Sequence, residues 1–178
     1  MNPIRLSLLA ERTSYRTDPP GTGEPEWSWE DFCHAAGASG CTEVETAALE
    51  YRWRQADRRR HTLYAYLMIE ADKARQRHRW PDRHDGRRYL ERMVQLALDV
   101  EANPRLDGLV PLVVPAGEDA KGKPRYQRFP GWWCLHLPWM GEAQWRKWGE
   151  PKYALVRQPL DIWAGEAMRK CRRLLREE

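Results

Sequence analysis

The placement of its prolines constrains the fold of this chain more than any other sequence feature. Asn103-Pro104 ends one apolar stripe, and four more prolines follow at positions 111, 115, 124 and 130. Because proline lacks a backbone donor and clashes with the preceding helical turn, this stretch is unable to hold a long helix. Residues 106–133 are therefore predicted to form a Pro-rich exposed loop or a short hairpin.

The clearest predicted helix lies just before this stretch. It begins at Gly86, with Asp85 as its N-cap, and ends at Asn103. Its apolar residues recur at i, i+3 and i+4 spacing, as one buried helix face requires. They are Leu90, Met93, Val94, Ala97 and Val100.

Two capping boxes mark earlier helix starts. Ser28 with Asp31 opens a short helix that Gly37 ends, and Thr42 with Glu45 opens a second one. An apolar stripe then runs toward Pro81, interrupted by the segment DRRRH, which leaves open whether one long helix or two are formed. The stripe consists of Val44, Ala47, Ala48, Tyr51 and Ala56, followed by Leu63, Tyr66, Leu67, Ile69 and Ala71.

A final helical region is predicted from about Glu142 to Arg176, with interruptions at 149–151 and at Pro159. The fold class is therefore mainly α, with one helical domain over residues 27–178 and a C-terminal helix-turn-helix-like pair at about 131–178. Residues 1–26 are expected to be an N-terminal segment and a linker, because RTDPPGTGEPE has no apolar periodicity.

The composition favours a folded protein of the cytoplasm. Charged residues make up 31% of the chain and apolar residues 42%, a mixture that is able to bury a core. No apolar run approaches the roughly 18 residues of a membrane span, so no membrane contact is expected. The four cysteines are spread along a chain large enough to fold without disulfides, which favours reduced thiols.

Charge is divided unevenly along the chain. Residues 1–50 carry three Arg and nine acids, whereas residues 51–178 carry 27 Lys or Arg against 17 acids. A basic surface attracts polyanions, so DNA, RNA or an acidic protein is a more suitable partner than a neutral metabolite. The alternative is a solvated helical surface on which opposite charges pair.

Basic residues cluster in three stretches outside the C-terminal region. They are Arg58, Arg59 and Arg60 in YRWRQADRRR, then Lys73, Arg75, Arg77, Arg79, Arg83, Arg87 and Arg88 in KARQRHRWPDRHDGRR, and Lys121, Lys123, Arg125 and Arg128 in the Pro-rich stretch. These stretches are predicted to contact phosphates, which provides affinity without sequence information.

The C-terminal region is the better of two candidates for a helix-turn-helix. In GWWCLHLPWMGEAQWRKWGEPKYALV, Gln144, Arg146 and Lys147 are predicted to face DNA while Trp145 and Trp148 pack inward, and Lys152 is a further DNA contact. The Trp residues of this region, which include Trp132, Trp133 and Trp139, serve either as core or as platforms on which bases stack.

No recognisable catalytic motif is present. GASGC lacks the lysine of a phosphate-binding loop, and Cys134 beside His136 is better explained as a packed cysteine than as a nucleophile. Cys33, Cys41, Cys134 and His136 are irregularly spaced without a C-x-x-C pair, so zinc is not predicted, although the sequence does not decide it. We expect neither an enzyme nor a cofactor.

The segment EAQWRKWGEPKYALVRQPLDIW resembles the end of bacteriophage late-gene antiterminators of the lambdoid Q type and of related small phage regulators. The similarity lies in a Trp-Arg helix followed by an aromatic-anchored helix. The chain lacks the Cys-rich zinc module of some members. The resemblance implies binding to phage DNA and to host RNA polymerase, with Arg146 and Lys147 contacting the DNA.

The leading hypothesis is therefore a DNA-binding, phage-type transcription regulator, of the antiterminator kind, that acts with host RNA polymerase. The alternative is an interaction protein of a phage or its host. It would use the same basic and aromatic surface to inhibit an acidic or nucleic-acid-binding partner, without catalysis.

Overall fold

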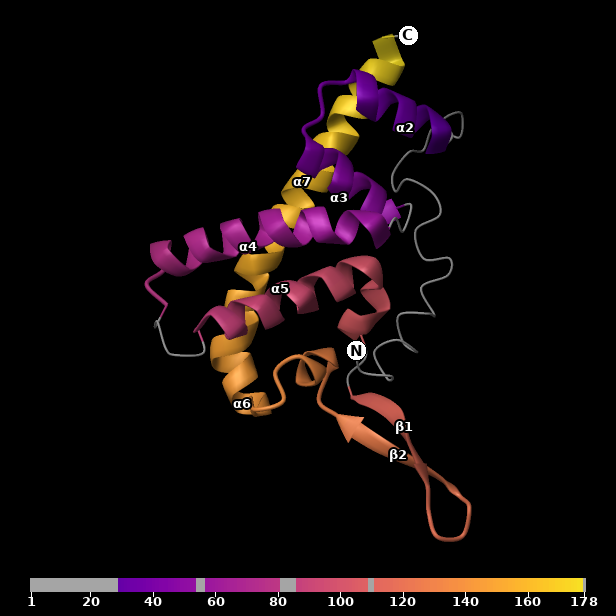
Figure 1. Cartoon of the computed structure of the whole chain (residues 1–178), viewed down its shortest axis with the longest axis vertical. Coiled ribbons are helices and arrows are strands. Elements are labelled where there is room, and N and C mark those ends of the chain that lie inside the picture. The colour runs from indigo at the N-terminus through magenta and orange to yellow at the C-terminus, as the bar shows by residue number, and fades with distance from the viewer. Residues whose placement is uncertain (1–28, 54–56, 81–85, 109–110, 178) are drawn as a thin grey trace.

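The computed structural model describes residues 29–53, 57–80, 86–108 and 111–177, and it confirms a mainly helical chain with one short hairpin (Figure 1). The α-helices are α2 (Trp29–Ala38), α3 (Glu43–Trp53), α4 (Arg60–Arg77), α5 (Gly86–Ala102), α6 (Glu142–Gln144) and α7 (Glu150–Glu177). The strands are β1 (Leu112–Glu118) and β2 (Pro124–Phe129). Short 3-10 turns occupy Asp57–Arg59, Pro104–Gly108 and Trp132–Leu135, and a π turn occupies Trp145–Gly149.

Helix α7 forms the spine of the molecule. It runs along the long axis of the view, and α2, α3, α4 and α5 all pack against it (Figure 1). Its buried residues recur at helical spacing, so they form one apolar stripe that the other helices cover. They are Tyr153, Val156, Leu160, Ala164, Ala167, Met168 and Cys171.

Several predicted helix ends are confirmed. The Thr42 backbone N–H donates to Glu45 Oε2 at 2.9 Å and the Glu45 N–H donates to Thr42 Oγ1 at 3.3 Å, so the capping box at the start of α3 is formed reciprocally. Helix α5 begins at Gly86 and stops before Asn103, as its stripe predicted. Of the two alternatives left open for the apolar stripe from Val44 to Ala71, two helices are formed, since α3 ends at Trp53 and α4 begins at Arg60. Residues 1–26, the Ser28 cap and the Asp85 cap lie outside the described residues.

The Pro-rich stretch forms the hairpin. Leu112 pairs with Phe129 and Val114 with Gln127, and a bulge between Pro115 and Glu118 shifts the register near the turn. Leu112 and Val114 are buried and anchor the hairpin to the core, while the remainder projects from the lower end of the molecule (Figure 1). Of the two alternatives predicted for residues 106–133, the hairpin is therefore the one formed.

The interruption predicted at Pro159 is wrong, whereas the one predicted at 149–151 coincides with a π turn that ends at Gly149, before α7 begins at Glu150. Residues 142–177 form one helical run that passes through Pro151 and Pro159. The Glu150 N–H donates to the Trp145 carbonyl, five residues back, and this wide turn places Pro151 in the first turn of α7, where its missing N–H is tolerated. Before this run, a four-residue 3-10 turn at Trp132–Leu135 stands where the first helix of the predicted pair was expected.

Trp148 does not pack inward, contrary to the prediction. The π turn carries the buried face from Trp145 to Gly149, four residues on, rather than to position 148. Trp148 is consequently rotated toward solvent and is 56% exposed.

Replacing Gly149 with alanine is expected to lower the free energy of unfolding by about 1–3 kcal/mol. A Cβ at this position would lie 2.5 Å from Trp145 Cε3 and 2.8 Å from Met140 Sδ, so the packed Trp145 ring must shift. Urea denaturation followed by circular dichroism measures the change.

Gly165 in the same helix provides a matched control. A Cβ added there meets nothing within 4 Å, so Gly165→Ala is expected to stabilise the helix by up to about 1 kcal/mol. Equal effects of the two substitutions would contradict close packing around Gly149.

Within the described residues, no helix is long and apolar enough to cross a membrane.

Candidate nucleic-acid interface

The hairpin arm, defined here as residues 112–129, gathers four predicted phosphate contacts on one projecting element: Lys121, Lys123, Arg125 and Arg128. All four are exposed, and none of them pairs with an acid of the described residues. The one acid of the turn, Asp119, accepts the backbone N–H groups of Lys121 and Lys123 at 2.8 and 2.9 Å. Asp119 therefore holds the turn in shape while the basic side chains extend outward.

The outer face of the arm combines cationic and aromatic groups. Tyr126 is 63% exposed, and it shares a face with Arg128 and with Val113, which pairs with Arg128 across the strands. The opposite face is anchored through Leu112 and Val114, with Arg125 exposed beyond them. A ribbon of this kind offers charge for phosphates and one flat ring for a base or a sugar.

A second surface pairs aromatic rings with cations at the start of α7. Lys147 Nζ lies 5.1 Å from the Trp148 ring, and Arg88 lies 5.8 Å from the Trp139 ring. Lys152 Nζ lies 5.7 Å from the rings of both Trp80 and Tyr89. We call the seven residues the Trp–cation surface: Trp80, Arg88, Tyr89, Trp139, Lys147, Trp148 and Lys152.

These residues are brought together from four segments. Arg88 and Tyr89 are neighbours on α5, so Trp139 and Lys152 meet the same turn of that helix. Lys152 follows Trp148 by four residues, which places both on one face of the helical run. Trp139 is 47% exposed, whereas burial of the Tyr89 hydroxyl raises its pKa to about 12. The predicted DNA contacts Lys147 and Lys152 therefore lie on an aromatic surface.

The predicted Arg cluster at the start of α4 is not brought onto this interface. Arg59 binds the Glu50 carboxylate, with Nε to Oε2 at 2.6 Å, and Arg58 lies 3.6 Å from the same group. Arg60 turns into the protein, where it meets Asp99 and the Tyr51 hydroxyl, both at 2.9 Å. All three guanidinium groups thus have protein partners.

Arg60, at the start of α4, belongs to a network of ion pairs around the buried acids of α5. Asp99 is fully buried and receives Arg60 on Oδ1 and the Nε2 of His136 on Oδ2, at 2.9 and 2.8 Å. Two residues further along α5, the buried Glu101 binds Arg52, which also reaches the exposed Asp161. Burial alone would lower the pKa of Arg52, but the hydrogen bonds that Arg52 donates to these two carboxylates raise it.

The residues considered for zinc and for nucleophilic chemistry have other roles here. His136 is engaged with Asp99, and burial raises the pKa of the Cys134 thiol, which disfavours the reactive thiolate. Across the described side chains, no three His, Cys, Asp or Glu residues are grouped so as to hold a metal ion. The side chain of Cys33 lies outside the described part.

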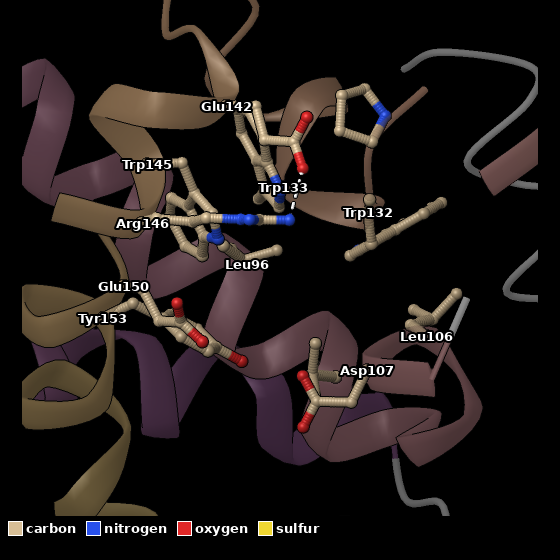
Figure 2. A pocket seen from close by; sticks show the side chains of 13 residues that line it. Leu96, Leu106, Asp107, Trp132, Trp133, Glu142, Trp145, Arg146, Glu150 and Tyr153 are labelled. Atoms are coloured by element: carbon tan, nitrogen blue, oxygen red, sulfur yellow. Dashed lines mark hydrogen bonds and ion pairs between the residues drawn. The ribbon is translucent and has the colours of Figure 1, made fainter. Parts of the chain in front are cut away.

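Between the base of the hairpin arm and the start of α7 lies a cavity of about 250 Å³, called here the Trp pocket (Figure 2). Trp132 lies on one side and Trp145 on the other, and the Trp145 ring is stacked on Trp133 with centroids 5.0 Å apart. The Arg146 guanidinium extends over the pocket and donates to Glu142 at 2.6 Å.

The three residues predicted to face DNA, Gln144, Arg146 and Lys147, therefore lie in different surroundings. Arg146 is paired at the mouth of the Trp pocket, and the Gln144 side chain accepts the Gly141 N–H at 3.4 Å, in a capping role. Lys147 alone of the predicted trio lies on the Trp–cation surface.

Sequence reasoning missed the Trp–cation surface as a unit and missed the Asp99 network entirely. The signal for Asp99 was an acid inside the apolar stripe of α5, two residues after Ala97. A charged residue at a buried helix position requires an ionic partner, here supplied by Arg60, and the second carboxylate oxygen is hydrogen-bonded to His136.

Comparison of the chain with protein-family models, with curated protein sequences and with solved structures finds no significant match.

Proposed function

We propose that the protein binds duplex DNA through the hairpin arm, which lies in the major groove of the bound duplex. One observation carries the proposal: Lys121, Lys123, Arg125 and Arg128 project together on a two-stranded ribbon, with no acid of the described residues paired to them. The major groove of B-DNA is about 12 Å wide and admits a two-stranded ribbon. Basic side chains on such a ribbon reach the phosphates on both sides of the groove.

We further propose that this binding serves transcription regulation of the phage antiterminator kind. The similarity of residues 142–163 to late-gene antiterminators of the lambdoid Q type supports this role. In this proposal the arm contacts the DNA, and the C-terminal helical run at 142–177 supports it. Lys147 and Lys152 contribute flanking phosphate contacts, while the exposed rings beside them remain for host RNA polymerase.

A second candidate function, that of an interaction protein, is favoured by the exposure of Trp139 and Trp148. Large aromatic side chains at a surface are typical of the centres of protein interfaces, and cations beside them select an acidic partner. Such a protein would inhibit its partner by occupying a surface, without catalysis.

Fluorescence anisotropy of a labelled duplex, titrated with the protein across a salt series, separates these two functions. If the four arm cations and the two flanking lysines contact phosphates, the logarithm of the binding constant should fall with the logarithm of salt concentration with a slope of about −5. Absence of duplex binding at low salt would exclude the DNA proposal. A pull-down with acidic protein fragments would then test the interaction protein.

A further inference from the structure

A groove of about 630 Å³ lies between the end of α3 and the C-terminal half of α7. It adjoins the upper part of α7 in Figure 1, whereas the hairpin arm projects from the lower end of the molecule. Gly165 and Met168 contribute uncharged surface, and no acid is among the described residues that line the groove. We call it the Arg groove, after four lining residues of α7: Arg169, Arg172, Arg173 and Arg176.

The positive charge of this surface is only partly balanced within its own helix. Residues 167–176 include five Lys or Arg and no acid. Exposed cations elsewhere on the helices pair with an acid one turn away, as Lys73 does with Glu70 at 2.9 Å. Arg172 and Arg176, in contrast, have no acid three or four residues away in the sequence. The intrahelical pairing that neutralises other helix surfaces is therefore incomplete here.

The groove is accessible to a partner. The Arg169 side chain is 60% exposed, and Arg173 and Arg176 are exposed as well. Gly165 is also exposed, and a Cβ added there would meet nothing within 4 Å. Another backbone is therefore able to approach α7 closely at this position.

The arginines share one face of α7 with an exposed isoleucine. Ile162 is 54% exposed, and the face that it opens continues at intervals of three and four residues. Its members are Ile162, Gly165, Arg169, Arg172 and Arg176. Arg169 and Arg176 are two turns apart, or about 10 Å along the helix axis. A second helix lying alongside presents carboxylates at matching intervals if its acids also recur every three or four residues.

We infer that the Arg groove binds an acidic amphipathic helix of a partner protein. The planar guanidinium group donates two parallel hydrogen bonds to a carboxylate, so a row of arginines suits a row of acids. An apolar side chain of the partner helix would cover Ile162, a contact that a phosphate backbone does not offer. The proposed duplex binding does not use this surface, so the inference goes beyond that function.

Three synthetic peptides of about 20 residues test the groove on the intact chain. The first carries glutamates every three or four residues on one helix face, with a leucine two turns away on the same face. The second has the same composition with its glutamates spread around the helix, and the third has glutamine in place of each glutamate. In fluorescence anisotropy of the labelled peptides, the first should bind about tenfold more tightly than the others.

Two variants and one control complete the design. Replacing Arg172, Arg173 and Arg176 together with alanine should weaken binding of the first peptide about tenfold. Gly165→Leu keeps every charge but places a side chain in the groove, so it should cause a similar loss. The control replaces three cations of α4 and α5 that pair with acids, and it should leave peptide binding nearly unchanged. They are Lys73, Arg75 and Arg87.

The outcomes separate a helix-binding groove from general charge attraction. Failure of the first peptide to bind, equal binding of the first two peptides, or equal losses in the two triple variants would overturn the inference. If the groove variant lost affinity for labelled DNA but not for the peptide, the arginines would be phosphate contacts, and the inference would also be wrong. The proposed duplex binding depends on the arm cations, so failure of the peptide to bind leaves that proposal unaffected.

Discussion

Replacing Asp99 with alanine is expected to lower the free energy of unfolding by about 3–5 kcal/mol, a large part of the stability of a domain of this size. Its carboxylate binds Arg60 and His136 at 2.9 and 2.8 Å in a fully buried position. Without it, the Arg60 guanidinium keeps its charge in a poorly solvated site and loses its principal counter-ion. Urea denaturation followed by tryptophan fluorescence measures the loss.

Asp161→Ala is the control for this substitution. Asp161 also binds an arginine, Arg52, but its side chain is 62% exposed and water replaces the lost contact. Its removal should cost no more than about 1 kcal/mol. If both substitutions lowered stability equally, burial of Asp99 would not be the cause of its effect.

Replacement of all four arm cations by alanine is expected to weaken duplex binding on the order of 1,000-fold at 0.1 M salt. The arm projects from the body and is anchored by Leu112 and Val114, so the protein should remain folded. Each lost phosphate contact also removes about 0.9 from the salt slope, which should fall to about −2 because Lys147 and Lys152 remain. Anisotropy across a salt series checks both results. The four substitutions are Lys121→Ala, Lys123→Ala, Arg125→Ala and Arg128→Ala.

A second quadruple variant controls for net charge. It removes four cations that already pair with acids on the helices, namely Lys73, Arg75, Arg87 and Arg169. Its duplex affinity should fall far less than that of the arm variant. Similar losses in the two variants would show that binding responds to overall charge rather than to the arm.

Periodicity predicted the helices because each needs one apolar face, and the Thr42–Glu45 box located the start of α3 within the chain. The same reasoning failed at Trp148, because a single π turn shifts the buried face by one position. No spacing rule anticipates that shift, which depends on the close contact of Gly149 with Trp145.

The candidate site was predictable only in part. Lys121, Lys123, Arg125 and Arg128 were identified because adjacent charges in a loop remain adjacent after folding. Arg58, Arg59 and Arg60 look equivalent in the sequence, yet Arg60 enters the core because Asp99, 39 positions later, comes to lie beside it. Such pairings depend on tertiary packing, which local patterns do not contain.

The position of α7 has a consequence during synthesis. It follows α2, α3, α4 and α5 in the chain, and it supplies the surface on which all four pack. A ribosome adds roughly 5–20 residues per second, so α3 emerges several seconds before residues 150–177 exist. During that interval the buried residues of α3, among them Leu49, Tyr51 and Trp53, lack the helix against which they pack. The nascent chain thus exposes this apolar surface until α7 leaves the exit tunnel.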